Sequence, residues 1–284
     1  MTRTLTLSFS CPDTTGIVAE VSTFIAQHKG WITEANQHSE NELSQFFMRV
    51  EIKADSLDFP PEEFNVRFQP IAQKFKMDAK VSDSAKAKRV IILCSKQEHC
   101  LYDLLARYVA QDFAFVIPCV ISNHENHRKI VEAHGLAFHY VPVTPENKNA
   151  AYRKMEEIFR KENADLIVLA RYMQVLDDAL CRNFAGKILN IHHSFLPSFA
   201  GAKPYHQAHG KGVKLIGATC HFVTPELDEG PIVEQDVIRV DHSESAEDMA
   251  HLGKDIEKIV LARGLRAVVE DRVLIAGTKT VVFR

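Results

Sequence analysis

Residues 90–101 read Val-Ile-Ile-Leu-Cys-Ser-Lys-Gln-Glu-His-Cys-Leu, an apolar run that passes through a polar turn into a segment with helical spacing. The same alternation of apolar run and helical segment repeats toward the C-terminus. The later apolar runs are at 114–117, 166–170, 187–191 and 215–223, and the helical segments are at 98–111, 124–134 and 147–163. Because strands that alternate with helices pack into a parallel sheet covered on both faces, we predict an α/β fold with an open, mostly parallel sheet.

The turn after the first of these strands, Ser95 to Leu101, contains no glycine. A dinucleotide-binding protein needs the pattern Gly-x-Gly-x-x-Gly at this place, because the glycines form the tight turn and let the backbone approach the pyrophosphate. We therefore expect no nicotinamide or flavin cofactor, and an oxidoreductase is the weakest of the functions considered. In an open α/β sheet the ligand lies beyond the carboxyl ends of the strands, so polar residues that end strands are the first candidates for a site.

A second, smaller domain precedes this sheet, as a length of 284 residues favours. The polar stretch 82–88 separates the two parts, and we place the domains at 1–84 and 85–284. In the first part the expected strands are at about 3–9, 31–38, 43–52 and 79–82, and the expected helices are at 16–28 and 61–77. The first helix carries Ile17 and Val21 on one apolar stripe. This order predicts a βαββαβ unit.

Charge and composition exclude several classes of protein. The net charge is −3; residues 1–84 hold 8 basic and 12 acidic side chains, which leaves 26 and 25 for the remainder. Neither part has the basic excess that nucleic-acid binding requires. No apolar run approaches the roughly 18 residues of a membrane helix, and the N-terminus lacks the pattern of a signal peptide. The six cysteines show no Cys-x-x-Cys spacing, so we expect reduced thiols in a cytoplasmic protein with no membrane or nucleic-acid partner.

Two polar residues in one apolar run are the strongest candidates for chemistry. Within Ile188-Leu189-Asn190-Ile191-His192, strand alternation puts Asn190 and His192 on the same face. The strand expected at 217–223 leads into a loop that carries Asp228. Acyl transfer requires an amide that donates to a developing oxyanion, an imidazole that handles protons near neutral pH, and a carboxylate that orients or deprotonates the nucleophile.

Four separated motifs make residues 88–284 resemble the folate-dependent formyltransferase family. The motifs are Leu169-Ala170-Arg171-Tyr172-Met173, Asn190-Ile191-His192-x-Ser194-x-Leu196-Pro197-x-Phe199, His221-Phe222-Val223 and Leu227-Asp228-x-Gly230-Pro231-Ile232. The resemblance implies a Rossmann-like catalytic domain in which Asn190, His192 and Asp228 are the catalytic residues. It also implies that two segments hold the pteridine of a reduced folate. The residues expected in those segments are Met173, Gln174, Val175, Leu176, Thr224 and Leu227.

Within that family the chain resembles the formyltetrahydrofolate deformylases over nearly its whole length. The motifs are Ser95-Lys96-x-x-His99-Cys100-Leu101, Ser122-Asn123-His124 and Gly201-Ala202-Lys203-Pro204-Tyr205. The glycinamide ribonucleotide transformylases carry a glycine- and asparagine-rich phosphate loop at the place of residues 95–101, so the resemblance implies water as the formyl acceptor. It implies hydrolysis of 10-formyltetrahydrofolate to formate for purine biosynthesis and tetrahydrofolate, with no cofactor. Whether Asp228 or His192 is the general base stays open.

Residues 3–83 resemble an ACT domain, the ferredoxin-like module that senses amino acids on many metabolic enzymes. The resemblance rests on Cys11 to Val18, Gly30-Trp31-Ile32 and Ala35-Asn36. It implies an effector site where backbone N–H groups at a helix start meet a carboxylate, with methionine or glycine as the effector. The residues expected there are Asp13, Gly16, Ile17 and Asn36. Alternatively, Asp13 is only a turn and capping residue and the domain supports oligomerisation. We expect a homodimer or a homotetramer.

Two other functions stay open at the level of the sequence. A formyltransferase that passes the formyl group to an amine is the nearest, and a folate-binding scaffold without activity is the next. Histidines gather between positions 192 and 221 but lack the spacing of a zinc or iron site, so we expect no required metal. We expect His221 to be a core histidine. Cys100 follows His99 directly, and because adjacent residues on a helix point apart, we expect it to pack and not to act as a nucleophile.

Overall fold

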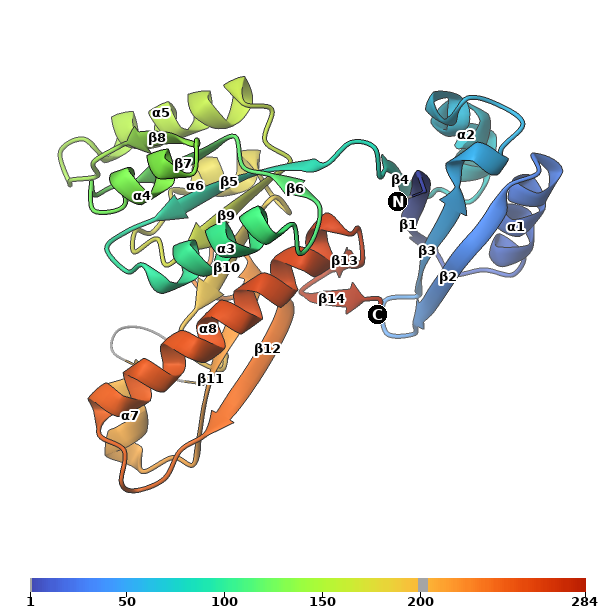
Figure 1. Cartoon of the computed structure of the whole chain (residues 1–284). Helices are drawn as coiled ribbons and strands as arrows, with labels where there is room; N and C mark the ends of the chain where they lie inside the picture. Colours follow the sequence, from blue (N-terminus) through green and yellow to red (C-terminus); the bar gives the residue numbers. More distant parts are fainter. Residues whose placement is uncertain (1, 199–203) are drawn as a thin grey trace. The chain divides into compact units, whose positions relative to one another are not determined.

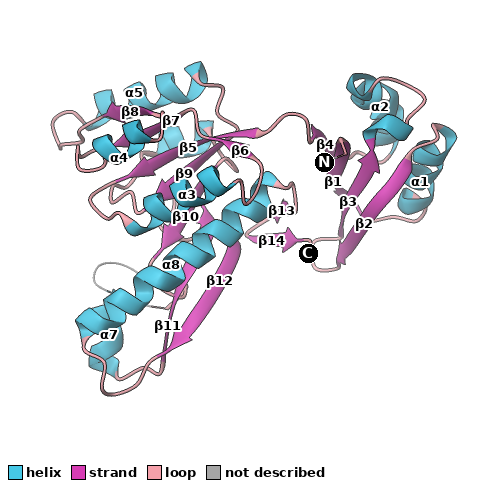
Figure 2. Ribbon diagram, viewed as in Figure 1, coloured by secondary structure: helices cyan, strands magenta, loops and turns pink. Residues whose placement is uncertain are grey.

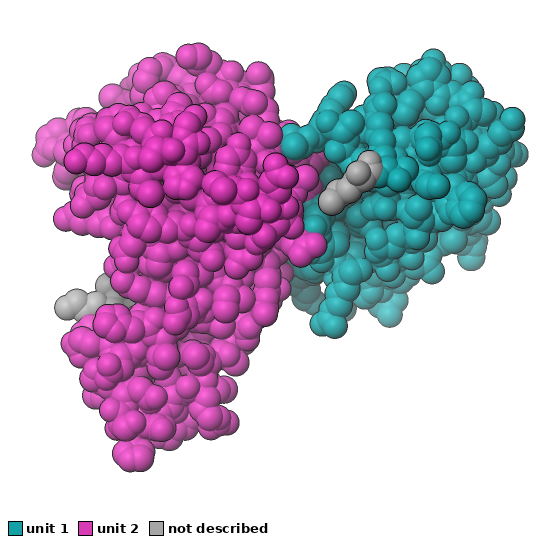
Figure 3. Space-filling view, in the orientation of Figure 1, with its two compact units in different colours: residues 1–87, 270–284 teal, residues 88–269 magenta. Residues whose placement is uncertain are grey.

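The computed structural model describes residues 2–198 and 204–284. It divides the chain into two compact units, residues 1–87 with 270–284 and residues 88–269 (Figure 3). The predicted division at 84/85 differs from this at both ends of the second unit. Phe199 and the stretch Gly201 to Lys203, which belong to the motifs above, lie outside the described residues.

Within the described part of the first unit, a four-stranded antiparallel sheet packs against two helices, as the βαββαβ order predicts (Figure 2). Its elements are β1 (Thr4–Pro12), α1 (Ile17–Gln27), β2 (Trp31–Glu40), β3 (Gln45–Lys53), α2 (Phe64–Lys74) and β4 (Asp78–Asp83), with 3-10 helices at Ala54–Ser56 and Pro61–Glu63. The strand order is β2-β3-β1-β4. Ile17 and Val21 of α1 are buried in one core with Leu7 and Phe9 of β1, so the predicted stripe is the packed face of the helix.

The C-terminal hairpin belongs to the first unit. β13 (Val273–Ala276) and β14 (Lys279–Val282) pair antiparallel, and Ala276 and Phe283 pack with Phe47 in a small apolar cluster. Phe47 lies between Phe46 and Met48, which face the helix-side core, so its side chain points to the other face of the sheet. The assignment of all of 85–284 to one domain therefore needs correction, because a polar linker marks where the chain leaves a unit but not where it returns.

Within its described part, the second unit forms an eight-stranded sheet in which β5, β7, β8, β9 and β10 are parallel and β11 and β12 are antiparallel. The strands are β5 (Lys88–Cys94), β6 (Phe115–Val116), β7 (Cys119–Ser122), β8 (Ala137–Tyr140), β9 (Leu166–Ala170), β10 (Ile188–His192), β11 (Leu215–Phe222) and β12 (Ile232–Arg239). The order is β12-β11-β10-β9-β5-β7-β8, with β6 beside β5. The predicted open, mostly parallel Rossmann-like sheet is confirmed; β7, β8 and β12 had not been predicted as strands.

Helices cover both faces of this sheet. They are α3 (His99–Ala110), α4 (Arg128–Ala133), α5 (Lys148–Lys161), α6 (Asp178–Asn183), α7 (Pro204–Lys211) and α8 (Ala246–Val269). On one face α5 and α6 bury Tyr152 and Leu180 against Ile91 and Leu169. On the other face α3 and α8 lie side by side (Figure 1). No helix among the described residues is both long and apolar enough to cross a membrane.

The carboxyl ends of the central parallel strands lie together at one end of the sheet. Because β5, β9 and β10 are parallel, their carboxyl ends meet there, and the chain continues through Ser95, Arg171 and His193. Open α/β sheets bind their ligands beyond these carboxyl ends.

Candidate active site

Strand β10 lies between β9 and β11 and carries Asn190 and His192 near its carboxyl end. The antiparallel register with β11 places Asn190 opposite His221 and His192 opposite Thr219. Asn190 is half-buried and His192 is buried, and both line the same cavity. The arrangement matches the alternation expected from the sequence.

Asp228 approaches His192 from the loop after β11. Its Oδ1 lies 3.2 Å from Nδ1 of His192. Burial alone raises the pKa of Asp228, but the hydrogen bond from His192 and the charge of that ring outweigh burial, so the pKa lies below its usual value. Asp228 is thus an anion at neutral pH and holds the proton of His192 on Nδ1. Among the described residues, Nε2 of His192 is buried and has no hydrogen-bond partner, so it is the nitrogen left for a ligand.

The loop that carries Asp228 is held close to β11 by a glycine. A Cβ added at Gly230 would lie 1.7 Å from the carbonyl oxygen of Phe222, so no other residue fits. The N–H of Phe222 donates to the carbonyl of Pro231 at 2.9 Å, which fixes the far end of the loop. Asp228 itself has φ 58°, a left-handed conformation that aspartate adopts more readily than most residues. The Asp228-x-Gly230-Pro231 motif therefore lets the loop backbone pack closely against β11, and it also supplies the carboxylate of the site.

His221 has a more specific place than the core position expected for it. Its Nδ1 lies 2.8 Å from the carbonyl oxygen of Phe222, to which it donates, and its Nε2 lies 3.1 Å from Nδ2 of Asn190. Burial lowers the pKa of His221, so the ring is neutral and its Nε2 accepts the Asn190 N–H. The histidine thereby fixes which way the Asn190 amide points and leaves its second N–H for a ligand.

The predicted catalytic and pteridine residues surround a single cavity of about 520 Å³. The cavity is lined by Asn190, His192, Asp228, Met173, Gln174, Val175, Leu176, Thr224 and Leu227, together with others such as Arg171, His193 and His221. Met173, Val175 and Leu227 are large apolar side chains that are more than half exposed on its walls. An apolar slot that leads to a few convergent polar groups suits a flat heteroaromatic ligand.

Ser95 holds the backbone of Met173, a residue that lines the cavity, in place. Its Oγ accepts the N–H of Met173 at 2.9 Å and donates to Oδ1 of Asn123 at 2.8 Å. The turn after β5, which lacks the glycines of a phosphate loop, thus serves to hold the loop after β9.

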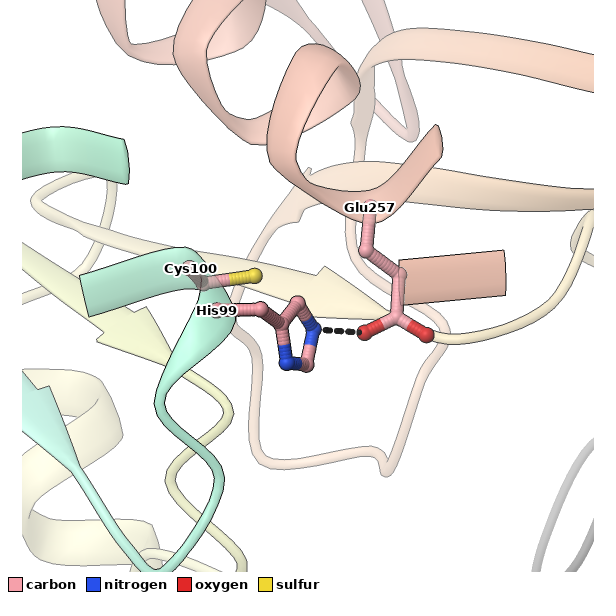
Figure 4. Close-up of side chains that lie close together, drawn as sticks. All are labelled: His99, Cys100 and Glu257. Carbon is pink, nitrogen blue, oxygen red and sulfur yellow. Dashed lines mark hydrogen bonds and ion pairs between the residues drawn. The ribbon is translucent and has the colours of Figure 1, made fainter. Parts of the chain in front are cut away.

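One buried group combines the residue types of a metal site. His99, Cys100 and Glu257 have potential ligand atoms within 4.8 Å of one another (Figure 4). The charges do not suit a cation, because Nε of Arg171 already lies 3.4 Å from Oε2 of Glu257. Burial also raises the pKa of the Cys100 thiol well above its ordinary value, which keeps it protonated. We interpret the group as an ionic hydrogen-bond network.

Sequence reasoning gave no role to Arg171, His193 or Glu257. One signal was present, because Glu257 interrupts the apolar stripe of α8 between Gly253 and Val260, all three of which are buried. A lone carboxylate on a packed helix face needs buried partners, and these came from segments too distant in sequence to recognise.

A half-buried, neutral histidine at this site predicts a loss of stability in acid. Burial first, and then the charge of Arg171, lower the pKa of His193 to about 3 from the ordinary 6.5. Between these values the unfolded chain binds a proton that the folded chain does not, so stability falls as pH falls. We expect His193→Gln to reduce the loss in free energy of unfolding between pH 7 and pH 5 by about 2 kcal/mol, measured by urea titration.

The exposed His251→Gln serves as the control for that prediction and is expected to keep the wild-type pH dependence. Equal pH slopes for His193→Gln and the wild type would contradict the assignment of His193 as a neutral ring in the folded protein.

The predicted effector residues are not all on one face of the first unit. Ile17 is buried in the helix-side core, and Gly16 precedes α1 with φ 92°. The N–H of Asp13 donates to the carbonyl of Ser44 at 3.0 Å. Asn36 pairs in register with Arg49 and donates to Glu34 at 2.6 Å, on the face opposite α1. Only Asp13, Gly16 and Ile17 therefore lie near the start of α1.

Comparison with known sequences identifies the family of this arrangement. The profile of the Formyl transferase family matches residues 88–265. A formyltetrahydrofolate deformylase of Corynebacterium sp. is 42% identical, covering 98% of this chain and 97% of that protein. The formyltetrahydrofolate deformylase of Bacillus subtilis is also 42% identical, over 98% of this chain and 93% of its own.

Solved structures separate two branches of the family. A formyltetrahydrofolate deformylase from Pseudomonas syringae pv. tomato is 55% identical with a TM-score of 0.98, covering 100% of this chain and 95% of that one. A phosphoribosylglycinamide formyltransferase from Anaplasma phagocytophilum is 29% identical with a TM-score of 0.65, covering 70% of this chain and 96% of that one. Because the likeness to the deformylases spans both units and the likeness to the transferases does not span the chain, this chain belongs to the formyltetrahydrofolate deformylase family.

Proposed function

We propose that this protein hydrolyses 10-formyltetrahydrofolate to formate and tetrahydrofolate. The main support is that Asn190, His192 and Asp228 line one cavity. The chain is also similar to a deformylase over its whole length. The names of those relatives state a deformylase activity, which favours hydrolysis over transfer to an amine.

The geometry supports a mechanism through a tetrahedral intermediate. Water attacks the formyl carbon, a C–O bond forms, and Asp228 accepts a proton of that water directly or through His192. The oxygen that becomes negative accepts hydrogen bonds from the free N–H of Asn190 and from Nε2 of protonated His192. The C–N10 bond then breaks, N10 is protonated as it leaves, and formate and tetrahydrofolate remain. His221, 3.1 Å from the Asn190 amide, is a positioning residue in this scheme.

The reaction changes no oxidation state, so it needs no redox group, and we propose that reduced folate is the substrate and that no cofactor takes part. Release of formate would supply purine biosynthesis and adjust the balance of formylated and free folate. We place this activity in the cytoplasm, where the reduced state of the six free cysteines would be maintained.

We further propose that the first unit senses methionine or glycine and that the protein is a homodimer or homotetramer. The effector proposal is supported by Asp13 and Gly16 at the start of α1 and no longer includes Asn36. Strands β2 and β4 are the outer strands of the first sheet, and strands in this position favour pairing between subunits. Isothermal titration calorimetry with each amino acid tests the effector, and sedimentation tests the assembly.

The deciding assay measures formate and tetrahydrofolate from purified protein and 10-formyltetrahydrofolate in buffer without an amine. Equal amounts of the two products are expected. Appearance of tetrahydrofolate only after addition of an amine, with no formate, would instead favour a transferase.

A further inference from the structure

A buried carboxylate stands directly behind the candidate active site. Glu257 on α8 is 1% exposed. Its Oε2 lies 2.7 Å from Nε2 of His99, its Oε1 accepts the hydroxyl of Tyr205 at 2.6 Å, and Nε of Arg171 lies 3.4 Å from Oε2 (Figure 4 shows His99 and Glu257). Three elements and the loop after β9 therefore meet at one carboxylate.

The charge of Glu257 is already compensated. Burial alone raises the pKa of Glu257, but the hydrogen bond from His99, the charge of Arg171 and the hydrogen bond from Tyr205 outweigh it and leave the pKa lowered. The group is therefore an anion whose oxygens are both engaged. It has no capacity left to bind a second cation unless Arg171 is removed.

Arg171 is the member of this ion pair that lines the cavity. Arg171 follows Ala170, the last residue of β9, and lines the same cavity as His192. Arg171 is 7% exposed, lines the cavity, and has φ 60°, a backbone conformation in which a long side chain is uncommon. The ion pair with Glu257 holds its side chain in the wall of the cavity.

A cation in the wall of a cavity repels a positively charged formyl acceptor more than a neutral one. Primary amines are mostly ammonium ions near neutral pH and need an anion to receive them before they lose a proton and attack. Asp228 is engaged by His192, and Glu257 is engaged by Arg171. Water carries no charge and is not repelled by the guanidinium.

We propose that Arg171, anchored by Glu257, is a specificity-determining residue that excludes amine acceptors from the cavity and so makes water the formyl acceptor. The inference rests on the proposed hydrolysis. In the excluded reaction, the ammonium ion would first give one proton to water, and the neutral nitrogen would then form a bond to the formyl carbon and lose a second proton to Asp228 or His192. The C–N10 bond would break, N10 would take up the second proton, and an N-formyl amine and tetrahydrofolate would result.

The test supplies glycinamide as a small cationic amine and measures N-formylglycinamide and formate by mass spectrometry. Arg171→Met removes the charge at similar length and frees Glu257 to receive the ammonium, so its ratio of formyl amine to formate is expected to exceed the wild-type background by about tenfold or more. Arg171→Lys keeps the charge and is expected to stay near the wild-type ratio. Arg153→Ala, at an exposed position on α5, is the matched control and should also keep that ratio.

The double variant Arg171→Met with Glu257→Gln removes both charges and avoids an unpaired buried carboxylate. Its ratio is expected to lie above the wild type, because the repulsion is gone, and below Arg171→Met, because the ammonium partner is gone. If Arg171→Met does not fold, the product ratio of the double variant tests the proposal. A folded single or double variant with the wild-type ratio overturns the proposal.

The same experiment distinguishes failure of this proposal from failure of the proposed hydrolysis. Folded Arg171→Met that releases neither formate nor formyl amine would place Arg171 in the hydrolytic machinery and would also overturn the proposal. Absence of formate release by the wild-type protein would instead reject the proposed hydrolysis, independently of any variant.

Discussion

Asp228→Asn is expected to lower the turnover number for formate release by about a thousandfold or more, with little change in KM. Asparagine has nearly the same volume and tolerates the left-handed backbone at φ 58°, so the loop should keep its place. The substitution removes the anion 3.2 Å from Nδ1 of His192, and with it both the group that accepts the proton of water and the one that fixes the tautomer of the imidazole. Steady-state measurement of formate and tetrahydrofolate gives both constants.

Asp178→Asn is the matched control for that experiment. Asp178 is exposed on α6 and pairs with Arg182 one turn away, so its loss should leave the turnover number unchanged. A loss of less than about tenfold in Asp228→Asn would mean that Asp228 neither accepts the proton nor orients His192.

Asn190→Ala is expected to lower the turnover number by about 100- to 1000-fold, again with KM nearly unchanged, because an oxyanion donor acts in the transition state more than in the bound substrate. The amide is held by the neutral Nε2 of His221 at 3.1 Å, so its donor is oriented before the substrate arrives. Such preorganisation is the reason that one hydrogen bond has so large an effect.

The control for Asn190→Ala is Asn183→Ala, which removes an exposed amide that donates to Glu156. Near-wild-type turnover by Asn190→Ala would show that the oxyanion is stabilised without this amide. An increase in KM alone would assign Asn190 to substrate binding.

The amino-acid sequence alone was enough to predict the fold class and the residues that gather at the cavity. The period of the apolar runs distinguishes strands from helices, and strand alternation puts Asn190 and His192 on one face, since both effects depend only on local geometry. The loop that carries Asp228 follows its strand closely, so its approach to the same edge could also be expected. All nine residues predicted from the sequence for catalysis and pteridine binding line the one cavity.

The residues that meet at a shared buried partner could be recognised only in the folded protein. Glu257 meets His99, Arg171 and Tyr205 through helix packing, at separations of 158, 86 and 52 positions, and no local pattern encodes such a meeting. The same holds for Phe47, which draws the C-terminal hairpin into the first unit. This difference arises because local spacing sets which face a side chain points to, whereas the register of strands and the packing of helices set which residues it contacts there.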